Sequence, residues 1–258
     1  MVTTTQHHRL KPRQSPNCDT WLGRHQAAME FITEKFHDVR HAGRPVAWVI
    51  GIGGQDKVTI GPESGSNPTF TPTEHIEVAQ ALEKAAVRDF FLYAMDISIQ
   101  SIAMAQEQLN SNKVKAARKG HPSLPKTAQG VDFIVSKGMA EKITLLGPGE
   151  SGDIFLTEPT EKPDIITVFN VARSYHRRHQ AQLGRKLADA LLVGGILLTN
   201  RTESQTVFVR TLEEMLGAAV DLGPCPDLVK PGRIVAFGKN TAGKGSPDKN
   251  CCDERKSH

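Results

Sequence analysis

Short apolar runs alternate with amphipathic segments along most of the chain. The apolar runs have the length and the β-branched content of strands, and they cover 46–50, 90–96, 164–170, 194–200 and 233–239. Between them, apolar residues recur every three or four positions, which predicts helices over 20–42, 73–88, 98–109, 176–192 and 211–220. Strands joined by helices of this length favour right-handed crossovers and parallel pairing.

Residues 111–150 interrupt this alternation. Two apolar stretches within them, 131–136 and 142–146, are long enough for short strands. The whole pattern predicts an α/β fold, a doubly wound, mostly parallel seven-stranded sheet with helices on both faces. The polar composition of the ends predicts an N-terminal tail and leading helix at 1–45, one domain at 46–239 and a flexible C-terminal tail at 240–258.

The first predicted strand runs into a glycine turn formed by Gly51, Gly53 and Gly54. Glycine lets the chain turn sharply and approach a ligand without an intervening Cβ, although a tight turn without a ligand fits equally well. A dinucleotide fingerprint needs another glycine at position 56, where this chain has Asp56. The turn therefore favours a nucleoside cofactor without phosphate, such as S-adenosylmethionine, over NAD.

Asp96 closes the second predicted strand, where a carboxylate can accept hydrogen bonds from both ribose hydroxyls. It follows Gly54 by 42 residues (96 − 54), about twice the spacing of the dinucleotide fingerprint. The excess comes from the segment 55–72, which is either a lid over the ligand or a surface insertion. We expect the helix after it to begin with Thr71 as N-cap and Glu74 completing a capping box.

Five segments in order resemble a known family. They are VIGIGG (49–54), YAMDISIQSIAMAQEQL (93–109), FIVSKGMAEKITLLGPGESGDIF (133–155), DIITVFNVARSY (164–175) and LADALLVGGILLTN (187–200). Together they resemble the S-adenosylmethionine-dependent methyltransferases with a Rossmann-like sheet. Within these, the chain looks most like the CheR type, which methylates glutamates of chemotaxis receptors, and the resemblance runs from about residue 46 to residue 239.

The resemblance implies S-adenosylmethionine as cofactor, no metal, and a role for each matching residue. The methionine part would lie near the glycine turn, the ribose at Asp96, and the adenine near Asp153 with Ile154. The cofactor-binding residues that it implies are Gly51, Gly53, Gly54, Asp96, Ile97, Asp153, Ile154 and Asn170. At the methionine end and the acceptor, the resemblance implies Asn170 and Tyr175 as catalytic residues. The third catalytic candidate, Arg173, comes from the basic composition of the same segment.

The chain departs from the family pattern around the acceptor. Phe169 precedes Asn170 where the family usually has arginine, and Tyr175 follows Asn170 by five residues instead of four. The glycine turn lacks the acidic continuation of the family, whose place Glu74 can take. Residues 217–232 are too few for the small receptor-tethering subdomain. The methyl acceptor therefore need not be a chemoreceptor.

The segment 165–188 contains no acidic residue but many basic ones. Arginines at the ligand edge can clamp an acidic acceptor, while an exposed, solvated helix face explains them equally well. His176 and His179 are spaced to share a metal, but no third ligand is evident. A carboxylate acceptor is ionised at neutral pH and needs no general base. The partner expected here is an acidic protein or a small-molecule acceptor.

The composition argues against several classes of protein. The formal net charge of +4 and the aromatic content of 5% argue against a nucleic-acid-binding protein. No apolar run is long enough to span a membrane, the first residues lack the apolar core of a secretory signal, and the four cysteines form no metal or redox motif. We therefore expect a cytoplasmic protein.

Three functions remain open. The first is a methyltransferase that O-methylates a carboxylate of a protein or small acid. The second is a small-molecule N- or O-methyltransferase of secondary metabolism. The third is a regulatory protein that binds the cofactor without turnover.

Overall fold

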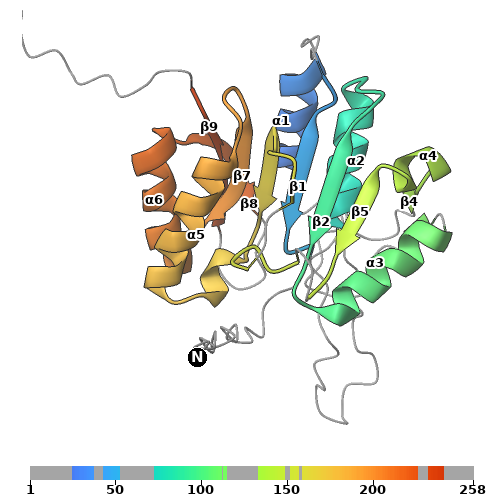
Figure 1. Ribbon diagram of the computed structural model, residues 1–258. Coiled ribbons are helices and arrows are strands. Elements are labelled where there is room, and N and C mark those ends of the chain that lie inside the picture. The colour runs from blue at the N-terminus through green and yellow to red at the C-terminus, as the bar shows by residue number, and fades with distance from the viewer. Residues whose placement is uncertain are drawn as a thin grey trace, which may run out of the picture.

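The computed structural model describes residues 25–37, 43–52, 73–111, 113–114, 133–148, 152–156, 159–225 and 232–240. Within these ranges, seven strands form one sheet in the order β5-β2-β1-β6-β7-β9-β8 (Figure 1). The first five of these run parallel, and β9 pairs antiparallel with both β7 and β8. The strands are β1 Val46–Ile50, β2 Phe91–Met95, β5 Ile143–Leu146, β6 Ile165–Val168, β7 Ile196–Arg201, β8 Val220–Cys225 and β9 Gly232–Gly238. The predicted fold class is confirmed.

Helices pack on both faces of this sheet (Figure 1). Because successive strand residues point to opposite faces, the sheet separates two apolar cores. Ala47 and Val49 of β1 belong to the core under α1, α2 and α3, while Trp48 and Ile50 belong to the core under α5 and α6. The helices are α1 Gln26–His37, α2 Glu74–Lys84, α3 Ile99–Ser111, the short α4 Lys137–Ala140, α5 Arg177–Ala190 and α6 Thr206–Leu216, with two 3-10 turns, η2 Ala172–Ser174 and η3 Glu203–Gln205.

Two predicted elements differ in the structure. The helix expected over 211–220 ends at Leu216, because Gly217 has a φ of +93°, and Val220 instead begins β8 at the sheet edge. The strand expected over 131–136 is β4, Phe133–Ile134, which pairs with β3, Lys113–Val114, in a separate two-stranded sheet. The seventh strand of the large sheet is therefore β8, which the sequence pattern missed.

The start of α2 also differs from the prediction. The N-cap is Thr73, whereas Thr71, predicted to cap the helix, lies outside the described residues. Thr73 Oγ1 lies 3.2 Å from Glu77 Oε2, to which it donates a hydrogen bond. The helix ends at Lys84, earlier than the predicted residue 88, and Ala86 follows with a φ of +61°.

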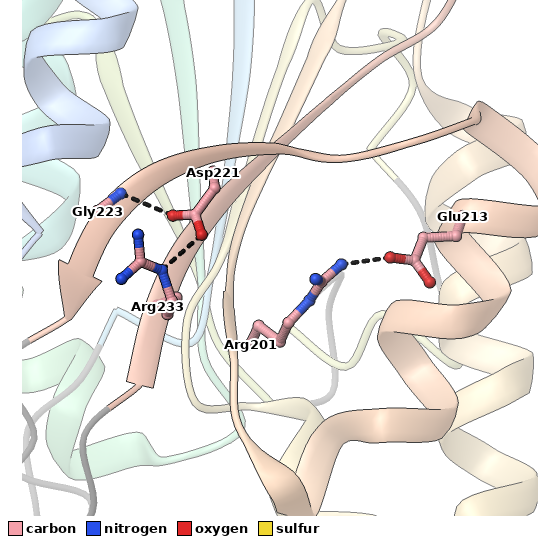
Figure 2. Close-up of polar contacts among 5 residues, drawn as sticks. All are labelled: Arg201, Glu213, Asp221, Gly223 and Arg233. Carbon is pink, nitrogen blue, oxygen red and sulfur yellow. Dashed lines mark hydrogen bonds and ion pairs between the residues drawn. The ribbon is translucent and has the colours of Figure 1, made fainter.

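The β8–β9 edge contains a bulge between Asp221 and Gly223. The N–H of Gly223 donates to Asp221 Oδ1 at 2.9 Å, and Arg233 of β9 donates to the other oxygen of the same carboxylate (Figure 2). The hydrogen bond from Arg233, followed by that from Gly223, lowers the pKa of Asp221. Nearby, Arg201 of β7 pairs with Glu213 of α6 (Figure 2). These contacts hold the antiparallel edge in register.

Lys239 connects the end of β9 to the end of α5. Its Nζ donates to the carbonyl oxygens of Ala188, Asp189 and Leu191 at 2.9, 3.2 and 2.8 Å. A positive charge on these carbonyls satisfies groups that the helix leaves unpaired and complements its dipole. The backbone of Lys239 also pairs with Gly194 and Gly195, just before β7. The chain therefore leaves β9 at the amino end of the parallel strands.

No helix among the described residues combines the length and the apolar character needed to cross a bilayer.

Candidate functional site

The strand order reverses between β1 and β6. Open α/β sheets bind their ligands at this point, in a crevice outside the carboxyl ends of the strands. The N–H of Gly51 donates to the carbonyl of Met95 at 2.8 Å, and the N–H of Asp96 donates to the carbonyl of Leu146 at 3.2 Å. These bonds align the ends of β1, β2 and β5. The residues that follow these three strands therefore share one edge of the sheet.

Gly51 is constrained by a protein neighbour. Its φ is +75°, and a Cβ built on it would lie 2.3 Å from Cγ2 of Val171. A side chain at this position would strain the backbone and collide with the turn that follows β6. Gly51 lies at the predicted edge, but the close approach that excludes a Cβ there is to Val171. Gly53 and Gly54 lie outside the described residues, so their cofactor contact stays a prediction.

Asp96 and Ile97 lie where the sequence predicts the ribose. Asp96 is half-buried, and its Oδ1 accepts a hydrogen bond from the N–H of Ser98 at 2.8 Å. This bond fixes the carboxylate at the start of α3. Ile97 is 38% exposed beside it. Both residues therefore lie at the carboxyl edge of the sheet, and their contact with a ribose stays a prediction.

Asp153 and Ile154 reach the same edge through a close backbone turn. The N–H of Gly152 donates to the carbonyl of Gly147 at 3.1 Å, and a Cβ on Gly152 would lie 2.4 Å from that oxygen. Asp153 Oδ1 accepts a hydrogen bond from the N–H of Phe155 at 3.0 Å. Ile154 is buried in the core under α5 and α6. Only glycine at position 152 lets this segment return so closely to the end of β5.

Tyr175 follows η2, in the turn after β6. Burial is the main cause that raises its pKa, followed by the negative charges of Asp153 and then Asp96. The phenol therefore stays protonated at neutral pH, which keeps it a hydrogen-bond donor. Tyr175, in the turn after β6, thus lies within electrostatic reach of Asp153 in the 152–156 segment and of Asp96 after β2.

Phe155 is a site residue that the sequence analysis missed. Its ring packs edge-to-face on Tyr175 at a centroid distance of 5.1 Å and on His179 at 6.4 Å. Burial, with the positive charges of Arg178 and His176, lowers the pKa of His179. The imidazole is therefore neutral at pH 7. The signal that identifies Phe155 is its place directly after the predicted pair Asp153 and Ile154.

Asn170 ends β6 in a left-handed conformation, with a φ of +60°. Asparagine tolerates this region better than most residues. Its N–H donates to Asn200 Oδ1 at 2.8 Å, and Asn200 Nδ2 donates to Asn170 Oδ1 at 2.7 Å. This buried pair fastens the ends of β6 and β7 together. Asn200 was missed, although it closes a predicted strand in the same way as Asn170.

The basic residues lie at the start of α5. Arg173 is half-buried in η2, and Arg177 and Arg178 are exposed in the first turn of α5. The first turn carries no acidic residue. Three arginines thus flank Tyr175 in sequence, on η2 and the first turn of α5. Among the described residues, no group of three or more His, Cys, Asp or Glu side chains is arranged to hold a metal ion.

A second set of buried polar side chains lies at the starts of α1 and α2. His25 stacks on Phe169 at a centroid distance of 3.9 Å. Glu74, to which the sequence analysis gave a possible carboxylate role, is buried, as are His75 and Glu77. Helices that precede and follow β1 by crossovers begin at the carboxyl edge. These residues therefore border the site behind the glycine turn.

No family model matches the chain, and no curated protein matches its sequence. Its fold is similar to that of solved methyltransferases. The N-methyltransferase NodS from Bradyrhizobium japonicum, solved in complex with S-adenosyl-L-homocysteine, is 11% identical with a TM-score of 0.45, over 84% of this chain and 88% of that chain. Magnesium protoporphyrin IX methyltransferase from Synechocystis, with bound SAM, is 14% identical with a TM-score of 0.47, over 83% and 78% of the two chains.

A precorrin-6Y C5,15-methyltransferase from Geobacter metallireducens is 13% identical with a TM-score of 0.43, over 83% of this chain and 89% of that chain. Similarities of this size do not decide what the chain binds or catalyses. The resemblance to the CheR type stays a prediction.

Proposed function

We propose that the protein is an S-adenosylmethionine-dependent methyltransferase that O-methylates a carboxylate. The observation that carries this proposal is the placement of Gly51 and Asp96 after neighbouring parallel strands, at the edge of the sheet where the strand order reverses. A nucleoside with a sulfonium and an amino acid part has hydroxyls for Asp96 and a positive charge that two carboxylates attract. The residues present fit such a cofactor.

The residues divide between a cofactor side and an acceptor side. Asp96 with Ile97 would hold the ribose, Asp153 with Ile154 the adenine end, and Gly51 the methionine end. Arg173, Arg177 and Arg178 give the acceptor side the opposite charge. A negatively charged acceptor is attracted to this side and repelled by the other, which orients it.

When bound, S-adenosylmethionine supplies a methyl group on a good leaving group. Transfer of that methyl group to an oxygen of the acceptor carboxylate would leave the electron pair of the broken carbon–sulfur bond on sulfur. No proton moves, so the chain needs no general base. Its residues contribute positioning and the exclusion of water. The Tyr175 phenol and the Asn170–Asn200 pair fix the edge against which the acceptor lies.

The test is a thermal-shift panel with S-adenosylmethionine, S-adenosylhomocysteine, NAD and ATP. Ligand at about 100 times its Kd stabilises a protein by about 2.7 kcal/mol, which raises Tm by a few degrees. We expect this rise with the two adenosyl compounds only. Methylation is then followed with acidic acceptors, and a base-labile product identifies a carboxyl ester. A base-stable product would instead indicate an amine or hydroxyl acceptor.

Asp96→Asn sharpens the test, because it keeps an oxygen for the Ser98 N–H and removes the charge. We expect at least a tenfold weaker affinity for S-adenosylhomocysteine with little change in the Tm of the free protein. The matched control is Asp89→Asn, an exposed aspartate that precedes β2 at the opposite edge. Equal affinities in the two variants would mean that the ribose lies elsewhere.

A further inference from the structure

Apolar side chains are exposed beside the proposed site. Ile99 is 74% exposed and Leu156 is 60% exposed. Ile97, at 38%, lies next to them in sequence but belongs to the cofactor side. Exposed apolar side chains beside the ligand-binding edge of a sheet are candidates for contact with a bound molecule. We call Ile99, Leu156 and the ring of Phe155 the apolar rim.

The contacts of the chain bring the members of this rim to one edge. Ile99 begins α3, directly after the strand that ends at Asp96. Gly147 lies against the first turn of α3, since a Cβ on it would be 3.8 Å from Ile102. The segment that Gly152 fastens to Gly147 then carries Leu156, whose N–H donates to the carbonyl of Asp153 at 2.9 Å.

The apolar rim borders the basic start of α5. Phe155 contacts Tyr175 and His179, and His179 is the residue after Arg178. Because burial keeps His179 neutral, the positive charge here comes from the arginine side chains. One edge of the site thus presents exposed cations next to exposed hydrocarbon.

We propose that the methyl acceptor is an amphiphilic carboxylic acid, with its carboxylate beside the arginines at the start of α5 and its hydrocarbon body on the apolar rim. This inference rests on the proposed function and specifies its acceptor. An acidic peptide fits less well, because its further carboxylates would lie on Ile99 and Leu156. Burying a charge on an apolar surface without a partner is costly.

Calorimetric titration of the S-adenosylhomocysteine-loaded protein tests this without turnover. The probes are acetate, hexanoate, decanoate and tetraglutamate. We expect affinity to rise by about fourfold for each methylene group that becomes buried. Tetraglutamate should bind no more tightly than acetate. Equal affinities along the aliphatic series, or tighter binding of tetraglutamate, would overturn the proposal.

Two variants locate the hydrocarbon on the surface. Ile99→Ser and Leu156→Ser together should lower the ratio of decanoate to acetate affinity by about tenfold or more, since several methylene groups lose their contact. The matched control is Val193→Ser, a side chain 57% exposed in the turn between α5 and β7 at the opposite edge. It should keep the wild-type ratio. An unchanged ratio in the double variant would contradict the placement.

The same titration separates the two proposals. A protein that binds S-adenosylhomocysteine but shows no dependence on chain length retains the proposed function and loses the amphiphilic acceptor. A protein that does not bind S-adenosylhomocysteine loses the proposed function itself.

Discussion

Gly51 stands where the first strand turns, with the side chain of Val171 in the place that a Cβ would occupy. The glycine thus satisfies two demands at once, a positive φ and a close approach of the turn after β6. The two demands are separable by mutation, because only the second depends on the size of residue 171.

Gly51→Ala should lower the free energy of unfolding by about 2 to 4 kcal/mol, the sum of overpacking and backbone strain. Adding Val171→Ala should recover the steric part and leave about 1 kcal/mol from the positive φ. Urea unfolding of the two single variants and the double variant measures this. Strictly additive losses would show that residues 51 and 171 do not collide.

The location of some site residues could be predicted because they end an apolar run in the sequence. Asp96 and Asn170 close apolar runs, so the parallel sheet brings them to one edge. Phe155 and Asn200 were missed because their roles depend on side-chain contacts across the edge. The close approach of Val171 to Gly51 could not be predicted either, since Val171 follows Gly51 by 120 residues (171 − 51).

Among the elements, α5 is held at its last turn by hydrogen bonds from Lys239, the residue that follows β9. Lys239 donates to three carbonyls there. Since α5 also carries the arginines of the acceptor side at its first turn, contacts at one end of the helix support the position of the other.

Lys239→Met should therefore lower the free energy of unfolding by about 1 to 3 kcal/mol, through lost charge-assisted hydrogen bonds and lost interaction with the helix dipole. The matched control is Lys162→Met, at an exposed lysine, which should stay within about 0.5 kcal/mol of wild type. Chemical denaturation of both variants checks this. Equal small effects would mean that the lysine contacts contribute no net stability.

Elements with a clear apolar period were predicted well, and those set by tertiary pairing were not. The parallel strands β1, β2, β6 and β7 are continuous apolar runs, so composition alone reveals them. In β8, Gly223 and Pro224 interrupt the run, and the strand exists because Arg233 and the β9 backbone hold it. The pairing of β3 with β4 likewise depends on a partner distant in sequence.

At the scale of the whole molecule, stability should depend on pH through a histidine. His75 is fully buried in the first turn of α2, and burial lowers its pKa to about 3 from 6.5. In the unfolded chain, His75 therefore takes up a proton near pH 6.5. In the folded chain, it takes up that proton only near pH 3. Stability is complete above the unfolded value and falls as the pH drops through this window.

Wild type should thus lose about 2 to 3 kcal/mol through His75 between pH 7 and about pH 4.5. His75→Gln should remove that part of the loss, whatever its stability at pH 7. His176→Gln, at an exposed histidine, is the matched control and should keep the wild-type difference. Unfolding free energies at the two pH values decide. The same loss in His75→Gln and wild type would contradict the assignment.

The placement of Lys239 has a practical consequence. The backbone of Lys239 pairs with Gly194 and Gly195, so residue 239 lies at the amino end of the parallel strands. Asp96 and Tyr175 lie at the opposite, carboxyl end. A sensor surface or fluorophore coupled at position 239 would leave the opposite edge of the sheet open to the bulk solution. Immobilised in this orientation, the protein can be screened against nucleosides and acids without the support blocking their entry.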